Sequence, residues 1–120
     1  MSVPIYKVNA VHLAFDKSHP PHLHVSAIGE VSSGGWKAPT LAPRVYITPP
    51  KDGIQDLDFE ATPPKGSEPV IQIILPIAAG AILALPDWMK GVRVHAKTNT
   101  VVTLFTDEAN LRQVAAVNHS

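Results

Sequence analysis

The stretch His22-Leu23-His24-Val25-Ser26-Ala27-Ile28-Gly29-Glu30-Val31 decides the fold of this chain. Apolar and polar residues alternate along it, and successive side chains of a β-strand point to opposite faces. One face of the predicted strand holds Leu23, Val25, Ala27 and Val31, and the other holds His22, His24, Ser26 and Glu30. The stretch therefore predicts a strand with one dry face and one wet face.

Two further segments show the same alternation. Leu57, Phe59 and Ala61 oppose Asp56, Asp58 and Glu60, and Val92, Val94 and Ala96 oppose Arg93, His95 and Lys97. We interpret the acidic residues of the first segment as a solvated strand face. The alternative is that they join Asp52 as oxygen ligands of a calcium ion.

The spacing of turn residues predicts an all-β chain. Twelve Pro and seven Gly residues, mostly in short clusters, divide the sequence into runs too short for long helices. The runs predict strands at 4–15, 22–32, 42–48, 54–61, 70–77, 80–85, 91–97 and 100–105. We expect one domain over residues 1–120, a small antiparallel β-sandwich of about seven or eight short strands, with a small barrel as the alternative.

Two local predictions concern the last part of the chain. Asn99 predicts a tight turn that pairs 91–97 with 100–105. Residues 107–117 predict either a short C-terminal helix or a last strand.

The most apolar part of the chain lies between Pro69 and Pro86. Its first segment, 70–75, is apolar on both faces, which predicts a covered central strand or, alternatively, a subunit contact. Pro76 and Gly80 interrupt the longer stretch, so we do not expect it to span a membrane.

The composition limits the function classes. Ten basic and ten acidic residues cancel, so no net field gathers nucleic acid or anionic lipid, and we expect no nucleic-acid partner. The chain has no Cys, which excludes disulfides, thiolate metal sites and thiol catalysis. The N-terminal residues lack the pattern of a secretory signal, so we expect a cytoplasmic protein.

Three histidines fall within six residues, in His19-Pro20-Pro21-His22-Leu23-His24. On a strand, His22 and His24 point the same way from backbones about 6.6 Å apart, a spacing from which both imidazoles can reach one ion. Glu30 follows on the same face, and His95 comes from another strand. These four residues are the candidate ligands of a divalent transition metal.

At these residues the sequence resembles the cupin family. That family places two His around one residue with a Glu soon after, as at His22, His24 and Glu30, and supplies a later His, as at His95. The resemblance implies a small cupin-like β-barrel that holds a metal with these four side chains. The competing interpretation is that the histidines lie on wet outer faces without a metal, because the residues between them are the ones that pattern as core.

Aromatic residues offer the candidate contact surface. Trp36, Tyr46 and Trp88 each present an apolar plane with a polar group, which suits contact with a ligand or a protein partner. The sequence has no Gly-x-Ser-x-Gly elbow and no phosphate-binding loop, so we predict no catalytic residues and expect no cofactor. The leading hypothesis is a binding or structural module that forms a homo-oligomer or binds a protein partner through the 70–85 region and Trp88.

Overall fold

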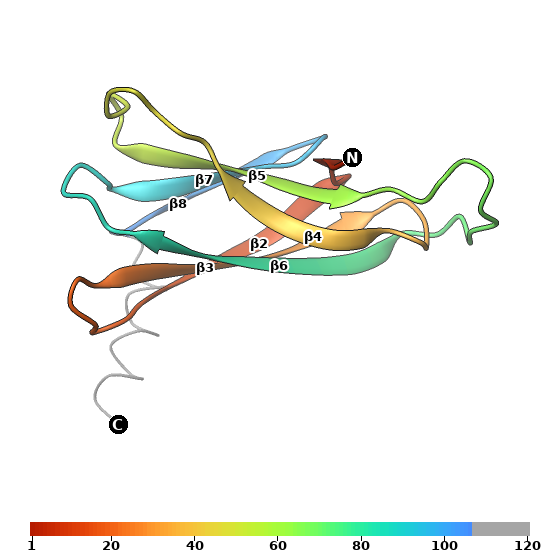
Figure 1. The fold of residues 1–120 in the computed structure, drawn as a ribbon, viewed down its shortest axis with the longest axis horizontal. Coiled ribbons are helices and arrows are strands. Elements are labelled where there is room, and N and C mark those ends of the chain that lie inside the picture. The colour runs from red at the N-terminus through yellow and green to blue at the C-terminus, as the bar shows by residue number, and fades with distance from the viewer. Residues whose placement is uncertain (107–120) are drawn as a thin grey trace.

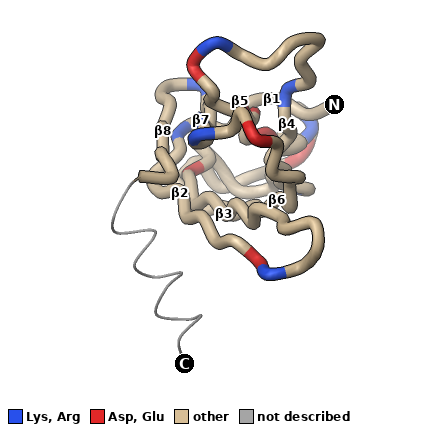
Figure 2. Tube along the Cα trace, turned by 90° about the vertical axis from the view of Figure 1, so that its left-hand side faces the viewer, with Lys and Arg blue, Asp and Glu red and all other residues tan. Residues whose placement is uncertain are grey.

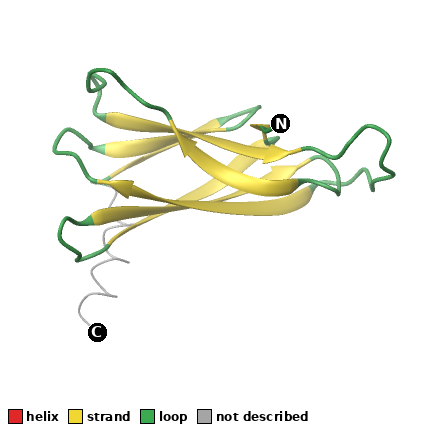
Figure 3. Cartoon of the chain, viewed as in Figure 1, coloured by secondary structure: helices red, strands yellow, loops and turns green. Residues whose placement is uncertain are grey.

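The computed structural model of the protein describes residues 1–106 and places eight strands in two sheets (Figures 1 and 3). The strands are β1 (Val3–Pro4), β2 (Lys7–Phe15), β3 (His22–Val31), β4 (Lys37–Pro43), β5 (Ile54–Thr62), β6 (Leu75–Ala84), β7 (Gly91–His95) and β8 (Thr100–Leu104). The described residues contain no helix, so the all-β prediction is confirmed for this part of the chain.

One sheet has three strands in the order β2-β3-β6, and all of its pairs are antiparallel. The other sheet has five strands around β5. Leu57 of β5 pairs with Pro43 of β4 on one edge and with Val94 of β7 on the other. β1 pairs with Glu60 and Ala61 near the C-terminal end of β5, past the residues that pair with β7. β8 pairs with β7.

The hydrophobic core is shared by the two sheets. The predicted dry face of β3 is confirmed, because Leu23, Val25, Ala27 and Val31 are at most 3% exposed. They belong to the same core cluster as Leu57 and Phe59 of β5 and as Val92 and Val94 of β7. Burial of each of the Val, Leu and Phe side chains stabilises the fold by about 1.5–3 kcal/mol.

The turn between β7 and β8 ties the two sheets together. Asn99 in this turn accepts a hydrogen bond from Val8 N at 2.9 Å and donates one to Val8 O at 2.7 Å. Lys97 N donates to Ile5 O at 2.8 Å beside it. These bonds satisfy the backbone where the chain leaves the five-stranded sheet after β1 and enters the three-stranded sheet as β2. The predicted pairing of 91–97 with 100–105 is confirmed.

Several predicted strand positions are wrong. The strand expected at 42–48 is β4, which lies at Lys37–Pro43. The two strands expected at 70–77 and 80–85 are one strand, β6, and it includes Pro76 and Gly80. β6 is an edge strand of its sheet, where a proline without an N–H group is tolerated.

Two predictions about the sheets are also wrong. The 70–75 segment is not a covered central strand, because Ile71, Ile73 and Ile74 are 73%, 52% and 49% exposed and precede β6. The sheets are not purely antiparallel, because β5 and β7 run parallel. The alternative of a small cupin-like barrel is wrong as well, because the strands form two separate sheets.

Two expectations are left open. The predicted helix or strand at 107–117 lies outside the described residues, and one domain over 1–120 stays a prediction. No helix within residues 1–106 is long and apolar enough to cross a membrane.

Candidate interaction surface

The outer face of the five-stranded sheet carries a hydrogen-bonded network around Asp56. Its Oδ1 accepts a bond from Arg93 at 2.9 Å and lies 2.6 Å from His95 Nε2. Its Oδ2 accepts a bond from the Tyr46 hydroxyl at 2.7 Å. Asp56 is 9% exposed, so the prediction that this residue lies on a solvated face is wrong. Because protein groups contact both carboxylate oxygens, the network links β5, β7 and the chain after β4.

These contacts keep Asp56 ionised. Burial favours the neutral acid, but the hydrogen bonds from His95, Tyr46 and Arg93 outweigh it and lower the pKa of Asp56 from 3.8 to about 2. Burial and the contact with Asp56 raise the pKa of Tyr46. The hydrogen bond from Arg93 lowers the pKa of Asp52. The network is therefore a set of matched charges that stabilises the fold.

We expect the free energy of unfolding to fall as the pH drops from about 4 to about 2. Asp56 is ionised in both states above this window, and within it the unfolded chain binds the proton first, so acid favours unfolding. A pKa of about 2 instead of 3.8 corresponds to about 2 kcal/mol. Urea unfolding at a series of pH values measures the effect, and Asp56→Asn should remove this part of it. Asp87→Asn, in an exposed turn, should leave the pH dependence of the free energy of unfolding unchanged. If both variants lost the same part of this dependence, Asp56 would not be its source.

A second polar cluster holds the connection between β2 and β3. Asp16 accepts hydrogen bonds from the Ser18 hydroxyl at 2.6 Å and from His22 N at 2.8 Å, and it lies 3.0 Å from His24 Nε2. These bonds, led by that from Ser18, hold the pKa of Asp16 well below its usual range. His22 Nδ1 is 3.7 Å from the same carboxylate, so the two histidines share one acidic neighbour.

The four predicted metal ligands do not come together. His22 and His24 lie at the start of β3, whereas Glu30 lies near its other end. His95 belongs to β7 in the other sheet, where it contacts Asp56. Within residues 1–106, no group of three or more His, Cys, Asp or Glu side chains could hold a metal ion.

Two of the three predicted aromatic contact residues, Tyr46 and Trp88, lie together, and Trp36 lies at the other end of β4. The rings of Tyr46 and Trp88 pack edge to face with their centroids 6.1 Å apart, and the Tyr46 hydroxyl is bonded to Asp56. Trp36 lies before β4, whereas Tyr46 follows it, and the buried Nε1 of Trp36 has no hydrogen-bond partner in the described residues. All three side chains are partly buried, and no single surface gathers them.

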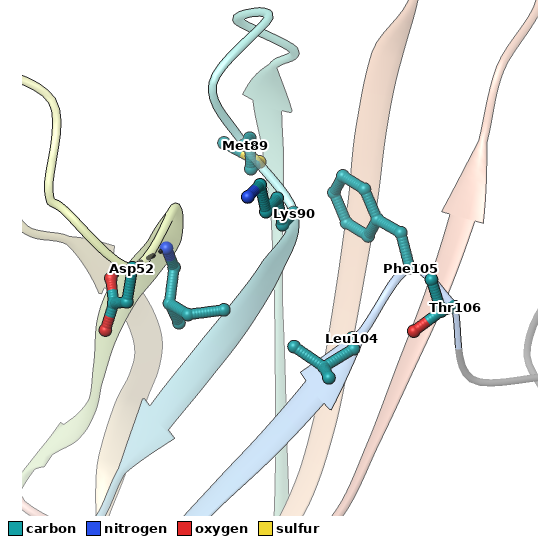
Figure 4. Close-up of a pocket in the computed structure, with 7 residues that line it drawn as sticks. Asp52, Met89, Lys90, Leu104, Phe105 and Thr106 are labelled. Carbon is teal, nitrogen blue, oxygen red and sulfur yellow. Dashed lines mark hydrogen bonds between the residues drawn. The ribbon is translucent and has the colours of Figure 1, made fainter.

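A cavity of about 440 Å³ lies beside the start of β7 and the end of β8 (Figure 4). Its lining is mostly apolar, and consists of Asp52, Ile54, Met89, Lys90, Leu104, Phe105 and Thr106. Asp52 is already bonded to Ile54 N at 3.0 Å and to Arg93 at 2.8 Å. Of the residues singled out in the sequence, the cavity contains only Asp52, the candidate calcium ligand, and we assign no site to it.

The outer face of the three-stranded sheet exposes large apolar side chains. Its central part, here called the β2–β3–β6 face, consists of Ala10, His12, Ala14, His24, Ser26, Ile28, Ala78, Gly80 and Ile82. Ile28 and Ile82 are 45% and 65% exposed there. The other members are small residues or histidines, and none is Asp, Glu, Lys or Arg.

The two outer faces of the molecule therefore differ in chemistry. Figure 2 shows charged residues on β5 and β7, whereas β6 has none along its length. Charge pairs cover the five-stranded sheet, but nothing in the described part of the chain covers the β2–β3–β6 face. The sequence pattern correctly indicated the wet face of β3. It did not indicate that this face continues onto β6, because residues 70–77 and 80–85 were predicted as two strands.

No family model, curated protein or solved structure showed a match to this chain.

Proposed function

We propose that this chain is a small β-sandwich that acts as a protein-interaction module and associates with a second copy of itself through the β2–β3–β6 face. The observation that carries the proposal is the exposure of Ile28 and Ile82 on a sheet face without charged side chains. Large aliphatic side chains exposed on an uncharged sheet face are typical of protein contact sites.

The shape of the face supports a sheet as its partner. Ala and Gly residues project little from the backbone, so a second flat sheet can approach closely. The whole outer face of this sheet, which extends from the row of Lys7 and Glu30 to the row of His22 and so beyond the β2–β3–β6 face at both ends, is about 30 Å long and about 15 Å wide, from a rise of about 3.3 Å per residue and a strand spacing of about 4.8 Å. Two copies would bury on the order of 1,000 Å² in total, which is near the lower limit for a specific interface. We therefore expect a weak dimer that forms with increasing concentration.

The proposal keeps part of the sequence-based hypothesis and changes the rest. The predicted contact region at 70–85 contributes Ala78, Gly80 and Ile82, but Trp88 packs against Tyr46 and takes no part. We do not carry the metal-dependent alternative forward, because its barrel is wrong and its four ligands lie apart. A cytoplasmic location stays part of the proposal.

We expect Ile82→Glu to abolish the dimer. A carboxylate at this position would have to lose its water in the contact, which is costly without a partner charge. Sedimentation velocity from about 1 to about 500 µM, a range that brackets the affinity expected for so small an interface, measures the association.

Ile71→Glu is the matched control, because Ile71 is 73% exposed but lies outside the face. It should leave the dimer unchanged, and both variants should keep the unfolding curve of the parent chain because both sites are exposed. A monomeric parent protein over this range, or equal effects of the two substitutions, would refute the proposal.

A further inference from the structure

We infer that the β3 strands of the two copies face each other and run antiparallel, related by a twofold axis that crosses the strands at Ser26. This arrangement is here called head to tail, because opposite ends of the face meet. This inference rests on the proposed function, because it needs the β2–β3–β6 face to be the contact. It adds which residues of the two copies meet and which charges select that arrangement.

The strand register places the outer residues in rows across the sheet. The middle row is His12, Ser26 and Gly80, and the rows on either side are Ala10, Ile28 and Ala78, and Ala14, His24 and Ile82. When the twofold axis passes through the middle row, the row that contains Ile28 in one copy lies over the row that contains His24 in the other copy. Aligned sheets cross at about 30° or less, so strands that face each other stay close near the centre.

Large and small residues then face each other on the outer strands. Ile82 of one copy lies over Ala78 of the second, and Ala10 lies over Ala14. On the central strand, Ile28 lies over the imidazole of His24. The most exposed large side chain of the face, Ile82, therefore meets a position with room for it.

Charges at the two ends of the face are complementary in this arrangement. At one end Lys7 and Glu30 are cross-strand partners. At the other end Asp16 lies beside His22 and His24. Head-to-tail packing brings the Lys7 ammonium toward the Asp16 carboxylate of the second copy, and it brings the Glu30 carboxylate toward imidazoles that can donate hydrogen bonds to it. The twofold symmetry makes each of these contacts twice.

The other face-to-face arrangement sets like charges against each other. With the twofold axis along β3, the strands of the two copies run parallel and each row lies over itself. Glu30 would then meet Glu30 of the second copy, and Lys7 would lie over Pro76. Like charges in contact disfavour an interface, so the charges select the head-to-tail form.

The test exchanges the two charges at one end. In the double variant Lys7→Glu/Glu30→Lys, the cross-strand pair keeps opposite charges, so the net charge and the fold should not change. Head to tail, the new carboxylate repels Asp16 in two symmetric contacts and the histidines lose the Glu30 acceptor, so the dissociation constant should rise about tenfold or more at low salt. A double variant away from the face, Lys97→Glu/Glu60→Lys, should leave it unchanged.

Combining this test with Ile82→Glu separates the two proposals. A dimer that Ile82→Glu abolishes and the charge exchange leaves intact would overturn the head-to-tail arrangement alone. A parent protein that is monomeric, or that Ile82→Glu does not affect, would overturn the proposed function and this inference with it. Loss of affinity in both variants supports both.

Cross-linking tests the arrangement directly, because the chain has no Cys of its own. With a short bismaleimide, a mixture of the Ala10→Cys and Ala14→Cys variants should give a cross-linked heterodimer if the copies pack head to tail. A mixture of Ala10→Cys and Ala78→Cys should react instead if the strands run parallel, since those positions then face each other. A covalent dimer in the second mixture alone would overturn the inference.

Discussion

Replacing Asp56 by Ala is expected to lower the free energy of unfolding by about 3 kcal/mol, because removing the central member of a partly buried ionic network takes a hydrogen-bond acceptor from three side chains at once. The Asp56 side chain is 13% exposed and its ion-pair partner Arg93 is 28% exposed. Without Asp56, the Tyr46 hydroxyl loses an acceptor and Arg93 keeps only Asp52. Urea unfolding at neutral pH measures the loss.

Asp58→Ala is the matched control for this experiment. Asp58 lies two residues further along the same strand and forms one ion pair, with Arg44, in which the two side chains are 32% and 48% exposed. Such an exposed pair contributes about 1 kcal/mol or less. If the two substitutions cost the same, burial and the shared hydrogen bonds do not give Asp56 the role assigned to it.

Replacing Gly29 by Ala is expected to cost about 3 kcal/mol or more, at or above the upper end of the usual range for overpacked cores. A Cβ at this position would lie 2.3 Å from Lys7 O and 2.5 Å from Ile5 Cδ1. Gly29 pairs with Val8 where the register of β2 and β3 shifts, so the backbone of β2 has to move to make room. Thermal or urea unfolding measures the effect.

Gly66→Ala provides the comparison, since a Cβ there would meet no atom within 4 Å. It should leave stability unchanged or raise it slightly by restricting the unfolded chain. Equal stability of the two Ala variants would show that the close approach of β2 to Gly29 relaxes without cost.

The strands with one buried face could be predicted from the sequence. In β3, β5 and β7 apolar and polar residues alternate, and the residues expected in the core of β3 are buried. This works because a strand that packs on one side alone needs a period of two. The hairpin at Asn99 could also be predicted, since a turn residue stood between two such strands.

β6 could not be placed in the same way. Its inner residues, such as Ile77 and Leu83, and its outer residue Ile82 are all apolar, so the sequence carries no signal for the inward face. Two strands were predicted, at 70–77 and 80–85, but Pro76 and Gly80 both pair with β3 as parts of one edge strand. The β2–β3–β6 face was missed for this reason.

The Asp56 network was missed because it depends on pairing between distant segments. Asp56 was predicted as one of a solvated acidic stripe, and nothing in its own strand indicated that Tyr46 and Arg93 would cover it. The parallel pairing of β5 with β7 places Arg93 and His95 beside β5. Local alternation shows which side of a strand is polar, and tertiary contacts decide whether that side is solvated.

The order in which the strands enter the two sheets has a consequence for how the protein is made. The chain places β1 in one sheet, β2 and β3 in the other, β4 and β5 in the first, β6 in the second, and β7 and β8 in the first again. No early fragment contains all the strands of either layer. During translation, the edge of β5 that pairs with β7 stays unpaired until β7 is synthesised, which is after β6. The nascent chain therefore exposes this strand edge until β7 leaves the ribosome.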